Sequence, residues 1–383
     1  MKPDFDLTDD ELRATASVKW TWAGPDVLPA WVAEMDVRPC PPVADALADA
    51  VRRGVVGYPA PDAHYRLGEV TAAFLWRRFG QMVDPALIRS CGDVMAAVRL
   101  TLETLCAPGP VVVPSPAYPP FLDIVGLTGR ELVTVPATSD GAGRPGLDVE
   151  RIGAALATGA GTILLAQPHN PLGRAYTVAE LEALRDVAVR YGARVISDEI
   201  HAPLVLPGAV HVPYASLAGT AEHVTTVLAA SKAWNTPGLK CAQLIAGTRR
   251  DATALDAAPH VANHGTSPLG LIATVAAYTE GEPWLDALLE HLAAQRDLFG
   301  ALLAAHLPQL SWTPMEATYL AWVDARATGL TDPATTALDG GRVLVNRGAT
   351  FGPGFDGYVR INLATSAERL HRIVERLTTA WPA

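Results

Sequence analysis

The sequence is poor in lysine. Only four of its thirty basic residues are lysines, Lys2, Lys19, Lys232 and Lys240, and the others are arginines. The chain also has no run of basic residues, and forty acidic residues give it a formal net charge of −10. Basic patches are the electrostatic footprint of nucleic-acid binding and of attachment to anionic membranes. The sequence therefore argues against nucleic acid and membrane surfaces as partners.

Long apolar runs and cysteine clusters are missing as well. No stretch of about 18 purely apolar residues occurs, so we expect no transmembrane helix. The first residues, "MKPDFDLTDDELRATAS", are acidic and polar, unlike a secretory signal, and predict a cytoplasmic protein. The four cysteines form no CxxC pair, which predicts buried, reduced thiols and no metal site.

What is present is a large apolar fraction arranged in short segments. The chain has 383 residues, 49% of them hydrophobic, enough for one large domain and a smaller one. The expected strands are "PVVVPSP", "ELVTVP", "TILLA", "ARVISDE", "TTVLAAS" and "AQLIAG". Their nearly unbroken apolar character is typical of a parallel sheet covered on both faces, and helical patterns separate several of them. Residues 46–275 are therefore predicted to form a large α/β domain with a mostly parallel sheet flanked by helices.

The predicted secondary structure differs before the first of these strands and after residue 275. Before the strands, "HYRLGEVTAAFLWRRFG" predicts a single helix that ends at glycine. Past residue 275, "WLDALLEHLAAQRDLFGALLAAHLP" predicts one long helix. Three strands, "TYLAWVDA", "VLVNRG" and "YVRINLA", and the helix "SAERLHRIVERLTTAW" follow it. We assign residues 1–45 and 276–383 to a small α+β domain.

Polar side chains follow three of the expected strands. Asn170 comes after "TILLA", Asp198 after "ARVIS" and Lys232 after "TTVLAAS". Ligands of open α/β sheets bind at the carboxyl ends of strands, so these groups are expected to converge. Lysine, unlike arginine, can lose its proton and attack a carbonyl, and a buried carboxylate can hold a heterocyclic nitrogen protonated. The alternative is a lysine that only extends to the surface beside a loop.

Seven stretches carry a resemblance to a known family. "SKAWNTPGLK", "PHNPLGR" and "SDEIHAPLV" resemble the signature stretches of fold-type I pyridoxal-phosphate enzymes, which have an aspartate-aminotransferase-like fold. "LPAWVAEMDV", "GVVGYP", "SPAYPPF" and "YVRINLATS" resemble the cystathionine β-lyase branch, the MalY/PatB-like C–S lyases. The resemblance runs from about Trp20 to Ser366 and implies pyridoxal 5′-phosphate as cofactor and an amino acid as substrate.

The resemblance also implies roles for single residues. Lys232 would bind the cofactor covalently, Asp198 would pair with its pyridinium nitrogen, and Asn170 with its phenolic oxygen. Tyr118 would stack on the ring. The phosphate would be held at a helix N-terminus by the side chain of Ser231 and the backbone of Val94, Met95 and Ala96.

Four further residues receive roles in the same way. Arg360 would clamp the substrate carboxylate beside Asn170, a bidentate task that suits a guanidinium. Lys240 would lie near the phosphate, and Tyr58 would reach the phosphate of a neighbouring subunit, which implies a homodimer. His201 stands where aminotransferases of this fold usually have tyrosine, and the lyase branch commonly has histidine there.

Ordinary structural roles remain the alternatives. Tyr118 can be a packed loop aromatic, Tyr58 a turn residue and His201 a structural histidine, whereas Arg360 between apolar neighbours suits a solvent-facing strand position. The pocket wall is expected to draw on "WTWAGPDVLPAWVAEMD". Its tryptophans, Trp20, Trp22 and Trp31, can line the pocket or pack in the small domain, and both interpretations stay open.

The reaction implied is α,β-elimination from an L-cysteine S-conjugate, which gives a thiol, pyruvate and ammonia. Lys232, Asp198 and Tyr118 would be the catalytic residues. An aminotransferase of the same fold is one alternative. A regulatory binding protein with little cofactor is another, because one member of this branch represses a transcriptional activator by contact. The sequence leaves the identity of the S-conjugate open.

Overall fold

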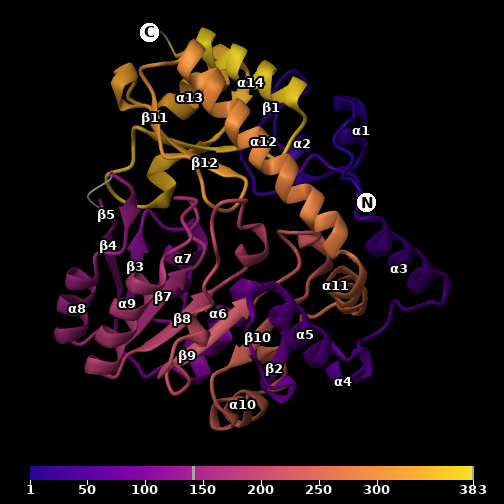
Figure 1. Cartoon of the computed structure of the whole chain (residues 1–383), viewed down its shortest axis with the longest axis vertical. Coiled ribbons are helices and arrows are strands. Elements are labelled where there is room, and N and C mark those ends of the chain that lie inside the picture. Colours follow the sequence, from indigo (N-terminus) through magenta and orange to yellow (C-terminus); the bar gives the residue numbers. More distant parts are fainter. Residues whose placement is uncertain (140–142, 382–383) are drawn as a thin grey trace.

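A seven-stranded sheet forms the centre of the computed structural model, which describes residues 1–139 and 143–381. The strand order is β2-β10-β9-β8-β7-β3-β4 (Figure 1). The strands are β2 (Ile88–Cys91), β3 (Val111–Ser115), β4 (Leu132–Pro136), β7 (Thr162–Ala166), β8 (Arg194–Asp198), β9 (Val224–Leu228) and β10 (Ala242–Ala246). The five strands from β4 to β9 are parallel, and β10 runs antiparallel to both of its neighbours. The predicted mostly parallel α/β sheet is confirmed.

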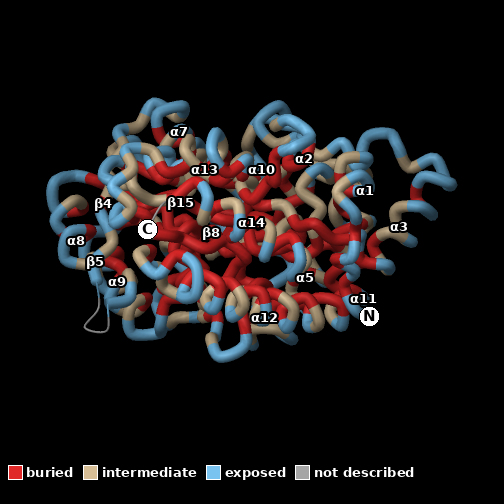
Figure 2. Tube along the Cα trace, turned by 90° about the horizontal axis from the view of Figure 1, so that it is seen from above, coloured by how far each residue is buried: buried red, intermediate tan, exposed pale blue. Residues whose placement is uncertain are grey.

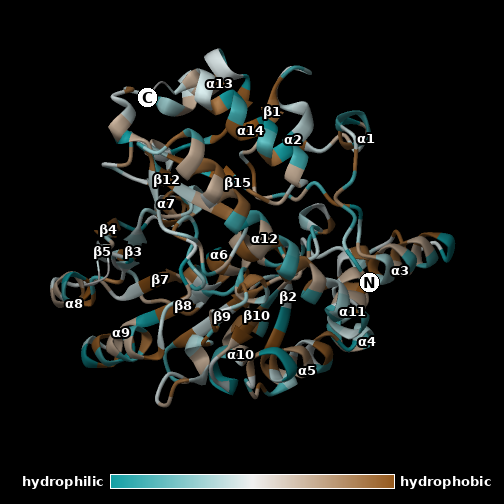
Figure 3. Ribbon diagram, turned by 45° about the horizontal axis from the view of Figure 1, so that its top comes forward, coloured by the Kyte–Doolittle hydropathy of each residue, from teal (hydrophilic) through white to brown (hydrophobic). Residues whose placement is uncertain are grey.

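Helices cover both faces of this sheet. Val111 and Val113 of β3 pack into one hydrophobic cluster, whereas Val112 between them packs into another on the opposite face. The helices of the first face are α6 (Val94–Thr104), α7 (Pro119–Leu127) and α10 (Arg249–Asp256), and those of the second are α8 (Val149–Ala157) and α9 (Val178–Tyr191). Burial on both faces explains why most of these strands, with the exception of β2, are largely apolar, and they are mostly brown in Figure 3.

The helix predicted over "HYRLGEVTAAFLWRRFG" is wrong in one respect. It is broken at Arg66, whose φ of 55° is left-handed, so that α4 (Asp62–Tyr65) and α5 (Leu67–Phe79) are separate helices. Leu67 is fully buried, and a Cβ at Gly68 would lie 2.6 Å from the carbonyl oxygen of Pro85. Tertiary contacts therefore fix where α5 begins, and sequence periodicity does not reveal them.

The C-terminal part forms a second, antiparallel sheet of order β11-β12-β15-β14. Its strands are β11 (Ser311–Trp312), β12 (Leu320–Asp324), β14 (Asn346–Arg347) and β15 (Tyr358–Asn362). The long helix α12 (Glu282–His306) runs from this sheet to α11 (Pro268–Glu280) (Figure 1). The helices α13 (Pro333–Gly341) and α14 (Ala367–Ala380) lie beside the second sheet (Figure 1). Within the described ranges no helix is long and apolar enough to cross a membrane.

The N-terminal segment packs with this second sheet. It contains α1 (Asp9–Ala14), α2 (Val18–Thr21) and β1 (Leu28–Pro29), and α3 (Pro41–Arg52) follows it. The strand β1 pairs in parallel with β13 (Val343–Leu344). The division of the chain at residues 46 and 275 stays a prediction.

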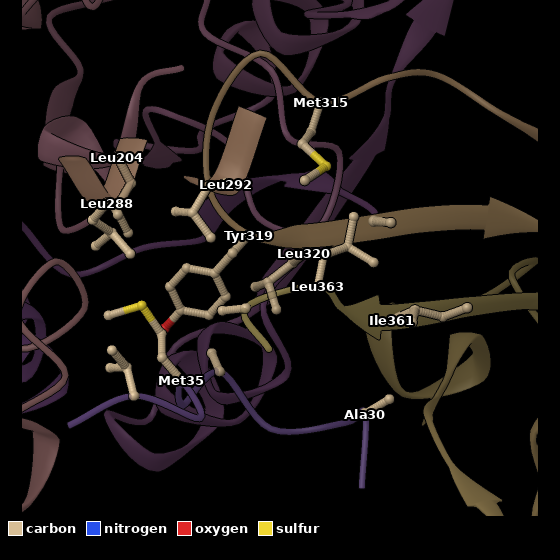
Figure 4. Close-up of a cluster of buried hydrophobic side chains, with 14 of the residues drawn as sticks. Ala30, Met35, Leu204, Leu288, Leu292, Met315, Tyr319, Leu320, Ile361 and Leu363 are labelled. Carbon is tan, nitrogen blue, oxygen red and sulfur yellow. The ribbon is translucent and has the colours of Figure 1, made fainter. Parts of the chain in front are cut away.

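The largest hydrophobic cluster joins the N-terminal segment to both sheets. Tyr319, next to β12, lies beside Met35 of the N-terminal segment and among leucines that include Leu204, Leu288 and Leu292 (Figure 4). Figure 2 shows that the buried residues gather in the centre of the molecule, whereas exposed residues lie mostly at its rim. This packing places residues 31–36 beside the carboxyl ends of β7, β8 and β9.

Candidate active site

The three polar residues that follow β7, β8 and β9 lie in one cavity. Asn170, Asp198 and Lys232 all line this cavity, which has a volume of about 230 Å³. Arg360 of β15 closes it from the second sheet. The convergence predicted from the strand ends is therefore present in the structure.

Lys232 is a half-buried residue whose amine lines the cavity and has a lowered pKa. Its Nζ donates a hydrogen bond to the carbonyl oxygen of Ala33 at 2.9 Å. Burial, and then the positive charge of Arg360, lower the pKa of Lys232 to about 8. With this pKa about one amine in ten is neutral at pH 7, far more than for an ordinary lysine, and only the neutral form can act as a nucleophile or general base. The surface-lysine alternative is wrong.

Asp198 ends β8 as a buried carboxyl group. Its Oδ1 accepts a hydrogen bond from the backbone N–H of Ile200 at 3.0 Å. Burial raises the pKa of Asp198 to about 7 despite this bond. A cationic group bound in the cavity would stabilise the ionised carboxylate, because an opposite charge offsets desolvation.

Arg360 is buried, with only 4% of its surface exposed. Its Nη1 donates to Asn170 Oδ1 at 2.9 Å, and its Nη2 donates to Asn346 Oδ1 at 2.6 Å and to the Trp31 carbonyl at 3.2 Å. These hydrogen-bond partners are all neutral groups. Among the described residues, Nε of Arg360 has no hydrogen-bond partner. Burial lowers the pKa of Arg360 to about 10. A buried guanidinium with neutral partners is suited to bind a carboxylate, and the solvent-facing alternative is wrong.

Another part of the cavity wall is suited to an anion. Val94 and Met95 line it at the N-terminus of α6, where free N–H groups and the helix dipole favour an anion. Ser231 and Lys240 line it as well, and Lys240 Nζ lies 2.8 Å from Asp93 Oδ2. Ala96 does not line the cavity.

The expectation for Ala96 needs a correction. Its backbone N–H donates to Asp93 Oδ1 at 2.8 Å, because Asp93 is the N-cap of α6. Burial raises the pKa of Asp93, but the hydrogen bonds from Lys240 and Ala96 outweigh it and hold that pKa below its ordinary value. The capping bond makes the N–H of Ala96 unavailable to an anion. The sequence pattern identified the helix start but not its capping bond.

Tyr118 and His201 form part of the cavity wall. Tyr118 precedes α7 and packs edge-on against Phe121, with 5.7 Å between ring centroids. Burial raises the pKa of Tyr118. His201 is buried, and burial followed by the charges of Lys232 and Arg360 lowers its pKa to about 3, so its ring is neutral. Its Nδ1 has no hydrogen-bond partner in the described chain, which leaves a polar atom for a ligand to satisfy.

Four aromatic residues considered in the sequence do not line the cavity. Tyr58 is fully exposed. Trp20 packs with Leu7 and Leu12, and its Nε1 donates to Asp36 Oδ1 at 2.7 Å. Trp22 is 71% exposed, and its ring lies 5.8 Å from that of Trp31. Trp20 therefore belongs to a packing cluster.

The sequence interpretation missed part of the cavity wall. Val32 and Ala33 line the cavity, and their segment is held by a buried ion pair between Lys19 and Asp36, with 2.8 Å between Nζ and Oδ1. From the sequence we expected this segment to contribute to the pocket wall and considered its tryptophans, whereas Val32 and Ala33 are the residues that line the cavity. The contact to Lys232 uses a backbone carbonyl, so no residue type signals it.

The fold and this cavity agree with the comparisons to known proteins. The chain belongs to the aminotransferase class I and II family, whose sequence profile matches residues 32–377. A cystathionine β-lyase of Corynebacterium glutamicum is 39% identical over 97% of this chain and 98% of its own. Cystathionine β-lyase PatB of Bacillus subtilis is 32% identical over 98% of this chain and all of its own. A crystal structure of a Corynebacterium diphtheriae protein, whose assignment as a PLP-dependent β-cystathionase is provisional, superposes with a TM-score of 0.93 at 38% identity, covering 98% of both chains.

Proposed function

We propose that the protein is a pyridoxal-phosphate-dependent C–S lyase. It would convert an L-cysteine S-conjugate such as L-cystathionine, with water, into a thiol, pyruvate and ammonia. The observation that carries the proposal is the amine of Lys232, which shares one cavity with a buried carboxyl group and a buried guanidinium. The near full-length similarity to cystathionine β-lyases supports the substrate class.

The donor set of the cavity fits the cofactor. An aldehyde requires a neutral amine, and Lys232 has a pKa of about 8. A phosphate suits the N-terminus of α6 beside Lys240, and a protonated ring nitrogen suits Asp198. His201 contributes a buried Nδ1 that has no partner in the described residues. When bound, pyridoxal phosphate supplies an electron sink for the pair released at the substrate Cα.

Each residue of the cavity would have a separate role in the elimination reaction. Lys232 Nζ would hold the cofactor and, when free, accept the proton from Cα as general base. Arg360 would bind the α-carboxylate with its guanidinium, and Asn170, already hydrogen-bonded to Arg360, would orient both groups. Asp198 would hold the proton on the ring nitrogen. Tyr118 would cover the ring and exclude water from one face.

Three further points belong to the proposal. The exposed side chain of Tyr58 would reach the cavity of a second copy, which requires a homodimer. Residues 46–275 would form the large domain, with residues 1–45 and 276–383 in the small one. The protein would work in the cytoplasm on a small amino acid.

The first experiment is absorption spectroscopy of the purified protein with and without L-cystathionine and an S-alkyl-L-cysteine, with pyruvate assayed. Borohydride reduction and peptide mapping then identify the modified lysine, because the chain has only four. We expect pyruvate release and a label on Lys232. The variant Lys232→Ala should lose both, whereas the matched control Lys2→Arg should keep both.

Other results would change the proposal. A labelled Lys232 with transfer of the amino group to a keto acid, but no pyruvate, would contradict the lyase and favour an aminotransferase. A protein that binds no cofactor would contradict the enzyme and favour a binding role.

A further inference from the structure

A segment without helix or strand is held against the cavity by side chains. This segment, Trp31–Asp36, is called the strap. Its carbonyl groups accept hydrogen bonds from side chains that follow β9 or lie on β15 and α2. The bonds run from Arg360 to Trp31, from Asn362 to Val32 and Glu34, from Lys232 to Ala33, and from Lys19 to Glu34. The strap is therefore fixed from both sheets, and one of its bonds holds the amine of Lys232.

Asn235 contributes a two-point contact to the strap. Its Oδ1 accepts from the N–H of Met35 and its Nδ2 donates to the carbonyl of Met35, both at 2.9 Å. The side chain of Met35 is buried beside Tyr319 (Figure 4). Met35 is thus fixed through its side chain and through both polar backbone groups.

The backbone of Asn235 has a conformation that few residue types adopt. Its φ is 55°, in the left-handed region, where asparagine is tolerated better than most residues other than glycine. Asn235 lies three residues after Lys232, so one loop carries both the amine and the side-chain amide that is hydrogen-bonded to the strap. The contact therefore links the two sides of the hydrogen bond between Lys232 and Ala33.

We propose that Asn235 is a positioning residue that acts through the strap to keep the Ala33 carbonyl in place as the acceptor for the free amine of Lys232. Ala33 lies two residues before Met35, so fixing Met35 limits the movement of that carbonyl. A neutral amine that donates one N–H to a fixed carbonyl has a restricted orientation of its lone pair, and proton transfer depends on such geometry. The inference rests on the proposed function, in which this amine is the general base.

The test uses a variant that removes the amide without straining the backbone. Asn235→Gly keeps the left-handed φ accessible and loses both bonds to Met35. The matched control is Asn263→Gly, because the Asn263 amide also donates to a backbone carbonyl, that of Ser90 at 2.9 Å, away from the strap. Circular dichroism and thermal melting establish that both variants fold.

The first measurement follows the titration of Lys232 in the full chain saturated with pyridoxamine 5′-phosphate, which has no aldehyde and leaves the amine free. Reductive methylation with ¹³C-formaldehyde gives one NMR resonance for each of the four lysines, and the dimethylated ammonium keeps one N–H to donate. In Asn235→Gly we expect the midpoint of Lys232 to fall by about one pH unit, because the ammonium loses an aligned acceptor.

The direction of the shift decides between two roles. The charged groups near the amine are Arg360, Glu34 and Asp198, and the variant substitutes none of them. The remaining bonds keep the strap over the cavity, so its water content should not rise. An unchanged midpoint would overturn the proposal. A rise would overturn it as well, because it would mean that Asn235 only keeps water out.

The second measurement uses the holoenzyme and an S-alkyl-L-cysteine deuterated at Cα. Asn235→Gly and the near-isosteric Asn235→Asp, which loses the donor to Met35, should lower kcat about tenfold with KM nearly unchanged. Both should raise the isotope effect on kcat. An isotope effect equal to that of the wild type would refute the positioning role. The NMR result holds even if the protein is not a lyase, so a failure of this inference is distinguishable from a failure of the proposed function.

Discussion

The carboxyl group of Asp198 should destabilise the folded chain at neutral pH when no cofactor is bound. Burial raises its pKa from 3.8 to about 7, so the folded state holds the ionised form unfavourably. Asp198→Asn keeps a side-chain oxygen that accepts from the N–H of Ile200 and removes the charge. We therefore expect this variant to stabilise the cofactor-free protein while it abolishes the activity that needs the carboxylate.

The magnitude and its pH dependence follow from the two pKa values. A difference of about 3 units corresponds to about 4 kcal/mol. Below about pH 4 the carboxyl group is protonated in both states and contributes nothing. Between about pH 4 and 7 only the folded state keeps the proton, so the stability falls by roughly 1.4 kcal/mol per pH unit. The gain from Asp198→Asn should grow from near zero at about pH 4 to about 4 kcal/mol at about pH 8.

The assay is urea unfolding of cofactor-free wild type and variant at several pH values across this range. Asp9→Asn is a matched control with the opposite trend. Burial raises the pKa of Asp9, but hydrogen bonds from Arg372 and Arg369 outweigh it and hold that pKa below its ordinary value. Its ionised form stabilises the fold above the unfolded pKa, so the cost of Asp9→Asn should grow as the pH rises. A gain from Asp198→Asn that does not vary with pH would refute the reasoning.

Three further predictions concern the other buried charges. Covalent uptake of pyridoxal phosphate by the cofactor-free chain should speed up with pH and level off above about pH 8, where Lys232 is deprotonated, and stopped-flow absorbance measures this. A flat profile would contradict the lowered pKa. Arg360→Lys should reduce kcat/KM by on the order of 10²–10³, because an ammonium cannot replace the fork that also binds Asn346, and an unchanged value would place the carboxylate elsewhere. Lys19→Met should destabilise the fold by about 3–5 kcal/mol in thermal melts, since it leaves the Asp36 carboxylate buried and unpaired. Lys19→Met/Asp36→Leu should recover most of that loss, and a double variant as unstable as the single one would show that the ion pair is not the cause.

The predictable part of the fold is the part coded by apolar pattern. The strand "TILLA" is β7 with both boundaries as predicted, because a strand covered on both faces needs an unbroken apolar run. The strand β2 lacks such a run, since Arg89 and Ser90 interrupt it, and it was not predicted. The break at Arg66 was missed for a related reason, because the packing of Leu67 and Gly68 determines it.

The candidate site shows the same division. Asn170, Asp198 and Lys232 were predicted to meet because strand ends of a parallel sheet share one edge, and the structure brings them together. The sequence by itself thus determined the parallel part of the sheet, the residues at its carboxyl edge and the family. Only the tertiary structure decided the burial of Arg360 and the strap that holds Lys232 through the Ala33 carbonyl. These features depend on contacts between residues far apart in the chain and on backbone groups that every residue carries, so neither spacing nor residue type encodes them locally.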